Sequence, residues 1–221
     1  MDKIQQIFNE KWAIEAKDYH HLLSLILPSI NNGNLAAIEQ HLLQNKVTAY
    51  AAMPYVADRW ELEDASLPEN SVVILTCDGV LYSWETYRLE QFIAKALAGI
   101  VLFVNGPGGM ITRVDLLERM IRESSKPIAA YITGVCASAH FWFVSACGRK
   151  FVSSPMDEIG SCGIIYTYQS FKKYYEELGV ELKDIYPDSA DLKNKMIRDM
   201  EEKQDDSLIK EKLSFYHNLF A

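Results

Sequence analysis

Long apolar runs are absent from this 221-residue sequence. A helix that crosses a membrane needs about 18 consecutive apolar residues, and the apolar pieces at 22–27 and 99–104 are only long enough for a protein core. Residues 1–6 also lack the charged and then apolar pattern of a secretory signal. We therefore expect no membrane insertion and a cytoplasmic location.

Cysteine pairs and basic stripes are missing as well. The four cysteines form no C-x-x-C pair and have no histidine at ligand spacing, so we expect no metal site and no disulfide framework. The 22 Lys and Arg are outnumbered by 30 Asp and Glu, giving a net charge of −8, which excludes nucleic acid as an expected partner. Nothing in the sequence points to a cofactor. For Cys136, a buried inert thiol is preferred over a reactive one.

What the sequence has is enough apolar residues, 49%, for one sizeable core. Residues 1–68 show helical spacing interrupted by proline and asparagine–glycine breaks, and the polar stretch 61–70 precedes a change of pattern. We predict a helical N-terminal arm at 1–68, an α/β core at 69–188 and a C-terminal helical segment at 189–221.

From residue 71 onward, short β-branched runs alternate with helical patterns. Such alternation is typical of an α/β fold with parallel strands joined by right-handed crossovers. The predicted strands are 72–75, 100–104, 128–132, 150–152 and 181–186, and the predicted helices are 87–97, 112–123, 138–147, 170–178 and a long one after Asp188.

A glycine-rich turn, 105–109, follows one strand and precedes a helix. Its paired glycines, Gly108 and Gly109, permit positive φ and allow backbone N–H groups to face an anion, as an oxyanion hole requires. Neither the G-x-G-x-x-G pattern nor the phosphate-loop Lys-Ser/Thr is present, which excludes the two common nucleotide-binding loops. A plain tight turn is the alternative interpretation.

Ser138 lies in a second strand-to-helix junction, among the small residues of 134–139. This setting suits a nucleophile approached closely by substrate, although a serine at a helix start is more often an ordinary cap.

These segments together resemble the signal peptide peptidase A (protease IV) family of serine peptidases, which has the Clp protease/crotonase-like fold. The resemblance covers residues 72–195, and the N-terminal arm is similar to phage and prophage members that act at capsid maturation. It rests on the segments 72–79, 106–109, 126–127, 136–142 and 159–165, the last containing a Gly-Ser-x-Gly signature. The resemblance implies a repeated ββα/βα superhelix with a helical N-terminal arm and a C-terminal helix.

By this resemblance Ser138 is the nucleophile, and Gly108, Gly109 and Ala139 supply the oxyanion donors. The family uses a lysine base, and the matching position is Lys193, with Lys195 as the alternative on the opposite side of a helix. His140 replaces the small or aromatic residue usual in the family; a packed or exposed histidine is preferred over a catalytic one.

The predicted function is a Ser–Lys endopeptidase acting on an extended peptide through an acyl-enzyme at Ser138. The alternatives are an inactive capsid-assembly or scaffolding protein with the peptidase fold, and a crotonase-like acyl-CoA enzyme. A neutral lysine requires burial that lowers its pKa by about 2–3 units from ~10.4. Because one small domain leaves such a site open, we expect a homo-oligomer, with peptides or phage capsid proteins as partners.

Overall fold

The computed structural model describes residues 12–14, 24, 48–52, 71–96, 98–168, 170–181, 183, 185–190 and 192–221. It contains two compact units, residues 1–165 with 220–221 and residues 166–219. The predicted boundary near residue 68 lies outside the described residues, as does most of the predicted helical arm. The predicted division after residue 188 stays a prediction.

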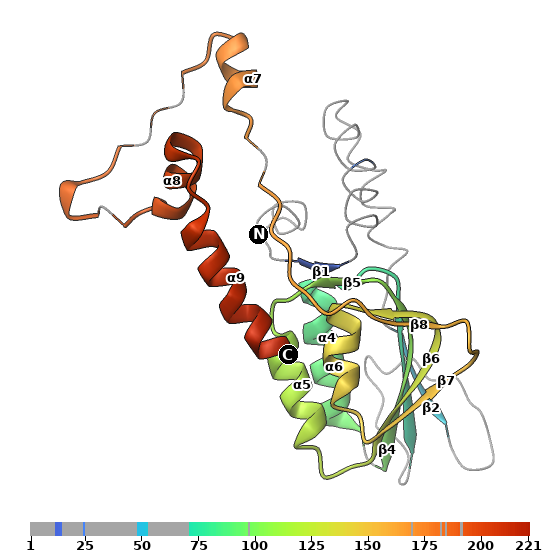
Figure 1. The fold of residues 1–221 in the computed structure, drawn as a ribbon. Coiled ribbons are helices and arrows are strands. Elements are labelled where there is room, and N and C mark those ends of the chain that lie inside the picture. The colour runs from blue at the N-terminus through green and yellow to red at the C-terminus, as the bar shows by residue number, and fades with distance from the viewer. Residues whose placement is uncertain are drawn as a thin grey trace. The chain divides into compact units, whose positions relative to one another are not determined.

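The first unit is built on a sheet with the strand order β2-β3-β4-β6-β7, in which β8 pairs with the far end of β6 (Figure 1). All of these pairings are parallel except that of β2 with β3. The strands are β2 (Thr48–Ala52), β3 (Val72–Asp78), β4 (Gly99–Gly106), β6 (Ile128–Ala137), β7 (Arg149–Val152) and β8 (Glu158–Gly160). The predicted α/β class with parallel strands is confirmed.

Three helices lie on the same face of this sheet: α4 (Ser83–Lys95), α5 (Val114–Arg122) and α6 (Ala139–Ser145) (Figure 1). Alternate residues of β3, including Leu75, are buried against them, while the residues between are partly exposed. In α5, Val114, Leu117 and Ile121 form the apolar stripe expected of a helix packed on a core, and all three are buried. The chain order of strand pair and then helix, as in β4, β5 and α5, is the repeat that the sequence resemblance implies.

A second, two-stranded sheet consists of β1 (Trp12–Ile14) and β5 (Gly108–Met110), which pair antiparallel. Both β1 and β2 come from the segment predicted to be a helical arm, so strands there were not anticipated. Each pairs with a partner remote in sequence, and such long-range pairing leaves little signal in a three- or five-residue stretch.

The second unit contains α7 (Lys172–Glu177), the 3-10 turn η1 (Asp188–Ala190), α8 (Lys195–Lys203) and most of α9 (Ser207–Phe220). The strand predicted at 181–186 is wrong: none of its described residues is in a strand, and Ile185 is 88% exposed. The single long C-terminal helix is also wrong, because Gln204 adopts a φ of 55° and ends α8 before α9 begins.

Candidate active site

Ser138 stands between the last residue of β6 and the first residue of α6. Its backbone has φ 54° and ψ −117°, a combination that non-glycine residues rarely adopt. Strained conformations of this kind persist where surrounding structure enforces them, and they cluster at functional sites. The Ser138 side chain forms no cap to α6, so the ordinary N-cap interpretation does not fit.

Two hydrogen bonds connect Ser138 to the last residue of β8 and to the segment that follows it. The Ser138 N–H donates to the Gly160 carbonyl oxygen at 2.8 Å, and the Ser138 hydroxyl donates to the Gly163 carbonyl oxygen at 3.3 Å. The residue is only 1% exposed. The Gly-Ser-x-Gly segment noted in the sequence therefore supplies both the acceptor for the Ser138 hydroxyl and the backbone support of the junction.

The glycine turn has a different local structure from the one predicted. Of the two paired glycines, only Gly108 has a positive φ, 108°. Gly109 is required for a different reason, because there is no room for a side chain at its position. A Cβ built on Gly109 would lie 2.0 Å from the carbonyl oxygen of Leu81. The pair belongs to the short strand β5 and not to a helix N-terminus, because α5 begins only at Val114. A helix dipole therefore contributes nothing to these N–H groups.

His140 joins the two junctions. Its Nδ1 accepts a hydrogen bond from the Gly108 N–H at 3.1 Å, and the residue is 1% exposed. Burial lowers the pKa of His140 to about 3, so the ring is neutral near pH 7. The sequence favoured a packed or exposed histidine over a catalytic one, and the structure shows a packed histidine whose ring also accepts the hydrogen bond of one predicted oxyanion donor, Gly108. This engagement also makes His140 a poor candidate for the base.

The third predicted donor, Ala139, is the first residue of α6. The first N–H groups of a helix have no acceptor inside the helix, so the Ala139 N–H depends on a partner outside α6. Its assignment as an oxyanion donor stays a prediction, as do those of Gly108 and Gly109.

Two polar residues that the sequence analysis did not select hold the loops around Ser138. The Asn105 side chain donates to Asp78 Oδ1 at 3.0 Å and accepts from the Val135 N–H at 3.1 Å, so it joins the ends of β3, β4 and β6. Asn105 heads the glycine-rich turn, which was an available signal.

Asp157 performs the same task on the other side of β6. Its carboxylate accepts from the N–H groups of Gly134 at 2.8 Å, Ser153 at 2.8 Å and Ser154 at 2.9 Å. These hydrogen bonds lower the pKa of Asp157, and the one from the Gly134 N–H has the largest effect. An aspartate in a loop carries no sequence signal for such a role.

The predicted lysines lie in the second unit, and Ser138 lies in the first. Lys193 is exposed, and Lys195 is half-buried and ion-paired with Asp199. Hydrogen bonds from Lys195 and then Lys203 lower the pKa of Asp199 to about 2. The amino group of Lys195 is thus already engaged, which favours Lys193 of the two, and a Ser138–Lys193 pair stays a prediction.

The part of the chain that contains Ser138 and both lysines is similar to known peptidases. Residues 120–218 match the model of peptidase family S49. A protein of Enterococcus faecium named "Putative signal peptide peptidase SppA" is 29% identical over 125 residues, which cover 52% of this chain and 36% of that protein. The resemblance to the S49 peptidases is confirmed.

A phage protein also matches. The head-tail preconnector protein GP5 of Enterobacteria phage P21 is 28% identical over 103 residues, 44% of this chain and 20% of that protein. The chain therefore spans well under half the length of these two relatives. Within the S49 match lie Ser138, Ala139 and both lysines, whereas Gly108 and Gly109 precede it.

Among solved structures, an enoyl-CoA hydratase/isomerase family member covers 49% of this chain and 47% of its own, at a TM-score of 0.35 and 14% identity. Similarity at that level says nothing about what this S49-like chain binds.

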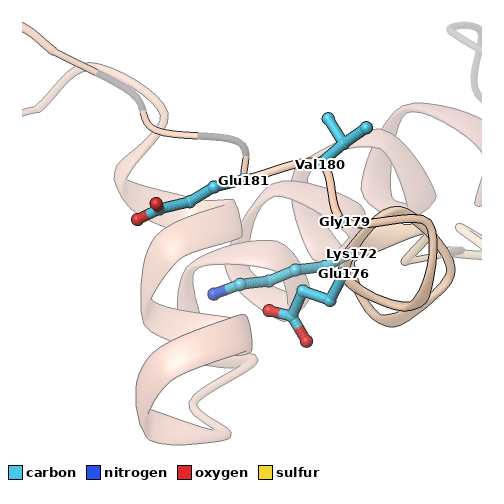
Figure 2. A pocket seen from close by; sticks show the side chains of 5 residues that line it. All are labelled: Lys172, Glu176, Gly179, Val180 and Glu181. Carbon is cyan, nitrogen blue, oxygen red and sulfur yellow. The ribbon is translucent and has the colours of Figure 1, made fainter.

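The second unit contains cavities among its described residues. One of about 370 Å³ is lined by Lys172, Glu176, Gly179, Val180 and Glu181, and Figure 2 shows Lys172 and Glu176 projecting from α7. A second, of about 420 Å³, is lined by residues between Tyr168 and Glu202. Neither is lined by Ser138 or by the predicted lysines.

The described part of the chain contains no cluster of three metal-ligating side chains. Within the same residues, no helix has both the length and the apolar character to span a membrane.

The four cysteines are unpaired, and three of them are buried. Burial raises the pKa of Cys136 to about 12, which makes it the inert thiol preferred from the sequence. Cys162 is exposed and adjoins Gly163, the acceptor of the Ser138 hydroxyl.

Proposed function

We propose that this chain is a serine endopeptidase in which Ser138 is the nucleophile and Lys193 the base. The observation that carries the proposal is the strained, buried Ser138 at a strand-to-helix junction inside the S49 match. Attack by the Ser138 oxygen on a peptide carbonyl forms an acyl-enzyme and releases the amine. Water then attacks the ester, releases the acid and returns the proton to the serine oxygen.

Lys193 takes the serine proton in this scheme and passes it to the leaving amine. It does so only as a neutral amine, which needs desolvation, and Lys193 is exposed in this chain by itself. We therefore propose that a second copy of the chain covers the lysine, so that activity depends on a homo-oligomer. The named phage relative supports capsid or connector proteins as substrates.

The first experiment follows cleavage of an unfolded protein by mass spectrometry. Ser138→Ala should abolish cleavage, whereas Ser145→Ala, the same change within α6, should leave it unchanged. Lys193→Ala should be inactive and Lys195→Ala close to normal, because Lys195 is already paired with Asp199. Wild-type cleavage by Ser138→Ala would overturn the nucleophile, and full activity of both lysine variants would overturn the dyad.

An inactive scaffolding protein is the second candidate. The engagement of the Gly108 N–H by His140 favours it, because an oxyanion cannot use that donor in this arrangement. A fluorophosphonate that reacts with activated serines separates the two: labelling of Ser138 in the assembled protein supports the peptidase, and its absence supports the scaffold.

A further inference from the structure

The edge of β5 beside the candidate site is covered by the chain's own N-terminal segment. Strand β1 pairs antiparallel with β5 in the register Trp12 to Met110, Ala13 to Gly109 and Ile14 to Gly108. Figure 1 shows β1 lying along β5, and β1 also contacts α6, the helix that follows Ser138.

The backbone of β5 directs the polar groups of Gly109 toward β1. On one side of β5, the Leu81 N–H donates to the Gly108 carbonyl oxygen at 2.8 Å, and the Met110 N–H donates to the Leu81 carbonyl oxygen at 2.7 Å. Successive residues of a strand direct their N–H and C=O groups to opposite sides. Gly109, between these two residues, therefore presents its N–H and C=O to the other edge, where Ala13 stands opposite.

We propose that β1 occupies the edge at which a peptide substrate pairs, so that the chain holds its own site closed until β1 leaves β5. The inference rests on the proposed function, because it takes the β5 edge as the substrate edge. An extended peptide binds such an edge through main-chain hydrogen bonds, and β1 already makes the same kind of pairing.

The rest of the site matches a closed state. Ser138 is 1% exposed, and its hydroxyl donates to Gly163. The Gly108 N–H is engaged by His140, and the Gly109 N–H faces β1. Both glycine donors are thus directed at groups of the same chain.

Because β1 belongs to the same chain, its pairing with β5 is intramolecular, and it competes strongly with a free peptide for the β5 edge. With only three paired residues, β1 is also short enough to be displaced. A single change that weakens its pairing should therefore open the edge to an added peptide.

The test compares two proline variants in the full chain. Ala13→Pro removes the N–H that faces Gly109, whereas Ile14→Pro removes one that points away from β5, where proline is tolerated in an edge strand. A fluorescein-labelled peptide with the sequence of residues 9–17 is titrated, with anisotropy as the readout, against each variant in a Ser138→Ala background. Ala13→Pro should bind the labelled peptide about tenfold more tightly than the parent does. Ile14→Pro should bind the peptide with the same affinity as the parent.

Equal affinities for the three proteins, or no binding to Ala13→Pro, would overturn the inference. Circular dichroism should show that each variant keeps its fold. Because these proteins lack Ser138, the peptide is not cleaved during the titration and the anisotropy reports binding alone. When Ser138 is restored, kcat/KM for cleavage of this peptide should be higher in Ala13→Pro than in the parent, by the same factor as the affinity. If the peptide binds as expected and none of the proteins that contain Ser138 cleaves it, the proposed peptidase function is wrong. The inference that β1 occupies the β5 edge is still supported in that case.

Discussion

The buried imidazole of His140 should make the stability of the chain depend on pH near neutrality. Folded His140 has a pKa of about 3 because of burial, whereas in the unfolded chain an ordinary histidine has a pKa of ~6.5. Below pH 6.5 the histidine is therefore protonated in the unfolded chain but not in the folded chain. The free energy of unfolding falls as the pH falls toward 3. Between pH 7 and pH 5 this loss amounts to about 2 kcal/mol.

The measurement uses urea unfolding at pH 7, 6 and 5 for the parent and for His140→Asn. Asparagine cannot titrate, and its side-chain oxygen can accept from the Gly108 N–H that His140 Nδ1 accepts now. The other four histidines are common to both proteins, so their contributions cancel in the difference. The parent should lose about 2 kcal/mol more than His140→Asn over this interval.

A third protein, His140→Leu, separates the proton from the hydrogen bond. It should also lack the extra pH dependence, and at pH 7 it should be less stable than His140→Asn by about 1–3 kcal/mol, because the buried Gly108 N–H loses its acceptor. If the parent and His140→Asn lost stability in parallel between pH 7 and pH 5, His140 would titrate normally and the buried, neutral ring would be refuted.

Two further predictions, the first with a control variant, concern the supports of the site. Gly109→Ala places a Cβ 2.0 Å from the Leu81 carbonyl oxygen and should lower the free energy of unfolding by about 1–3 kcal/mol, whereas Gly163→Ala, with nothing within 4 Å, should be close to neutral by urea unfolding. Asp157→Asn weakens the acceptor for the Gly134 N–H and should lower Tm at pH 7; because the pKa of Asp157 is lowered in the fold, that difference should shrink as the pH falls below about 4. Equal Tm values at pH 7 would show that the carboxylate charge is not needed.

The central strands were predictable because burial itself shapes their sequence. The runs at 72–75, 100–104 and 128–132 are apolar since they pack in the middle of the sheet, and β3, β4 and β6 contain them. The run at 181–186 is short and mixes polar with apolar residues, and its described residues lie in no strand, because a short run by itself does not create a pairing partner.

The site was predictable in its residue types and less so in its contacts. Paired glycines mark a backbone constraint, but the sequence does not separate the positive φ of Gly108 from the close approach of Gly109 to Leu81. The bond between His140 and Gly108 spans 32 residues, and no local pattern encodes it. The strained Ser138 was found because small residues flank it at a strand-to-helix junction.

Because the thiols are unequally buried, one native cysteine can be labelled selectively with a dye. With three cysteines buried, Cys162 is the exposed thiol, and it sits beside the residue that accepts the Ser138 hydroxyl bond. A maleimide dye added to the folded, unmodified chain should attach there first, next to the candidate nucleophile. Its fluorescence would follow movement of the 160–163 segment in real time, without any engineered cysteine.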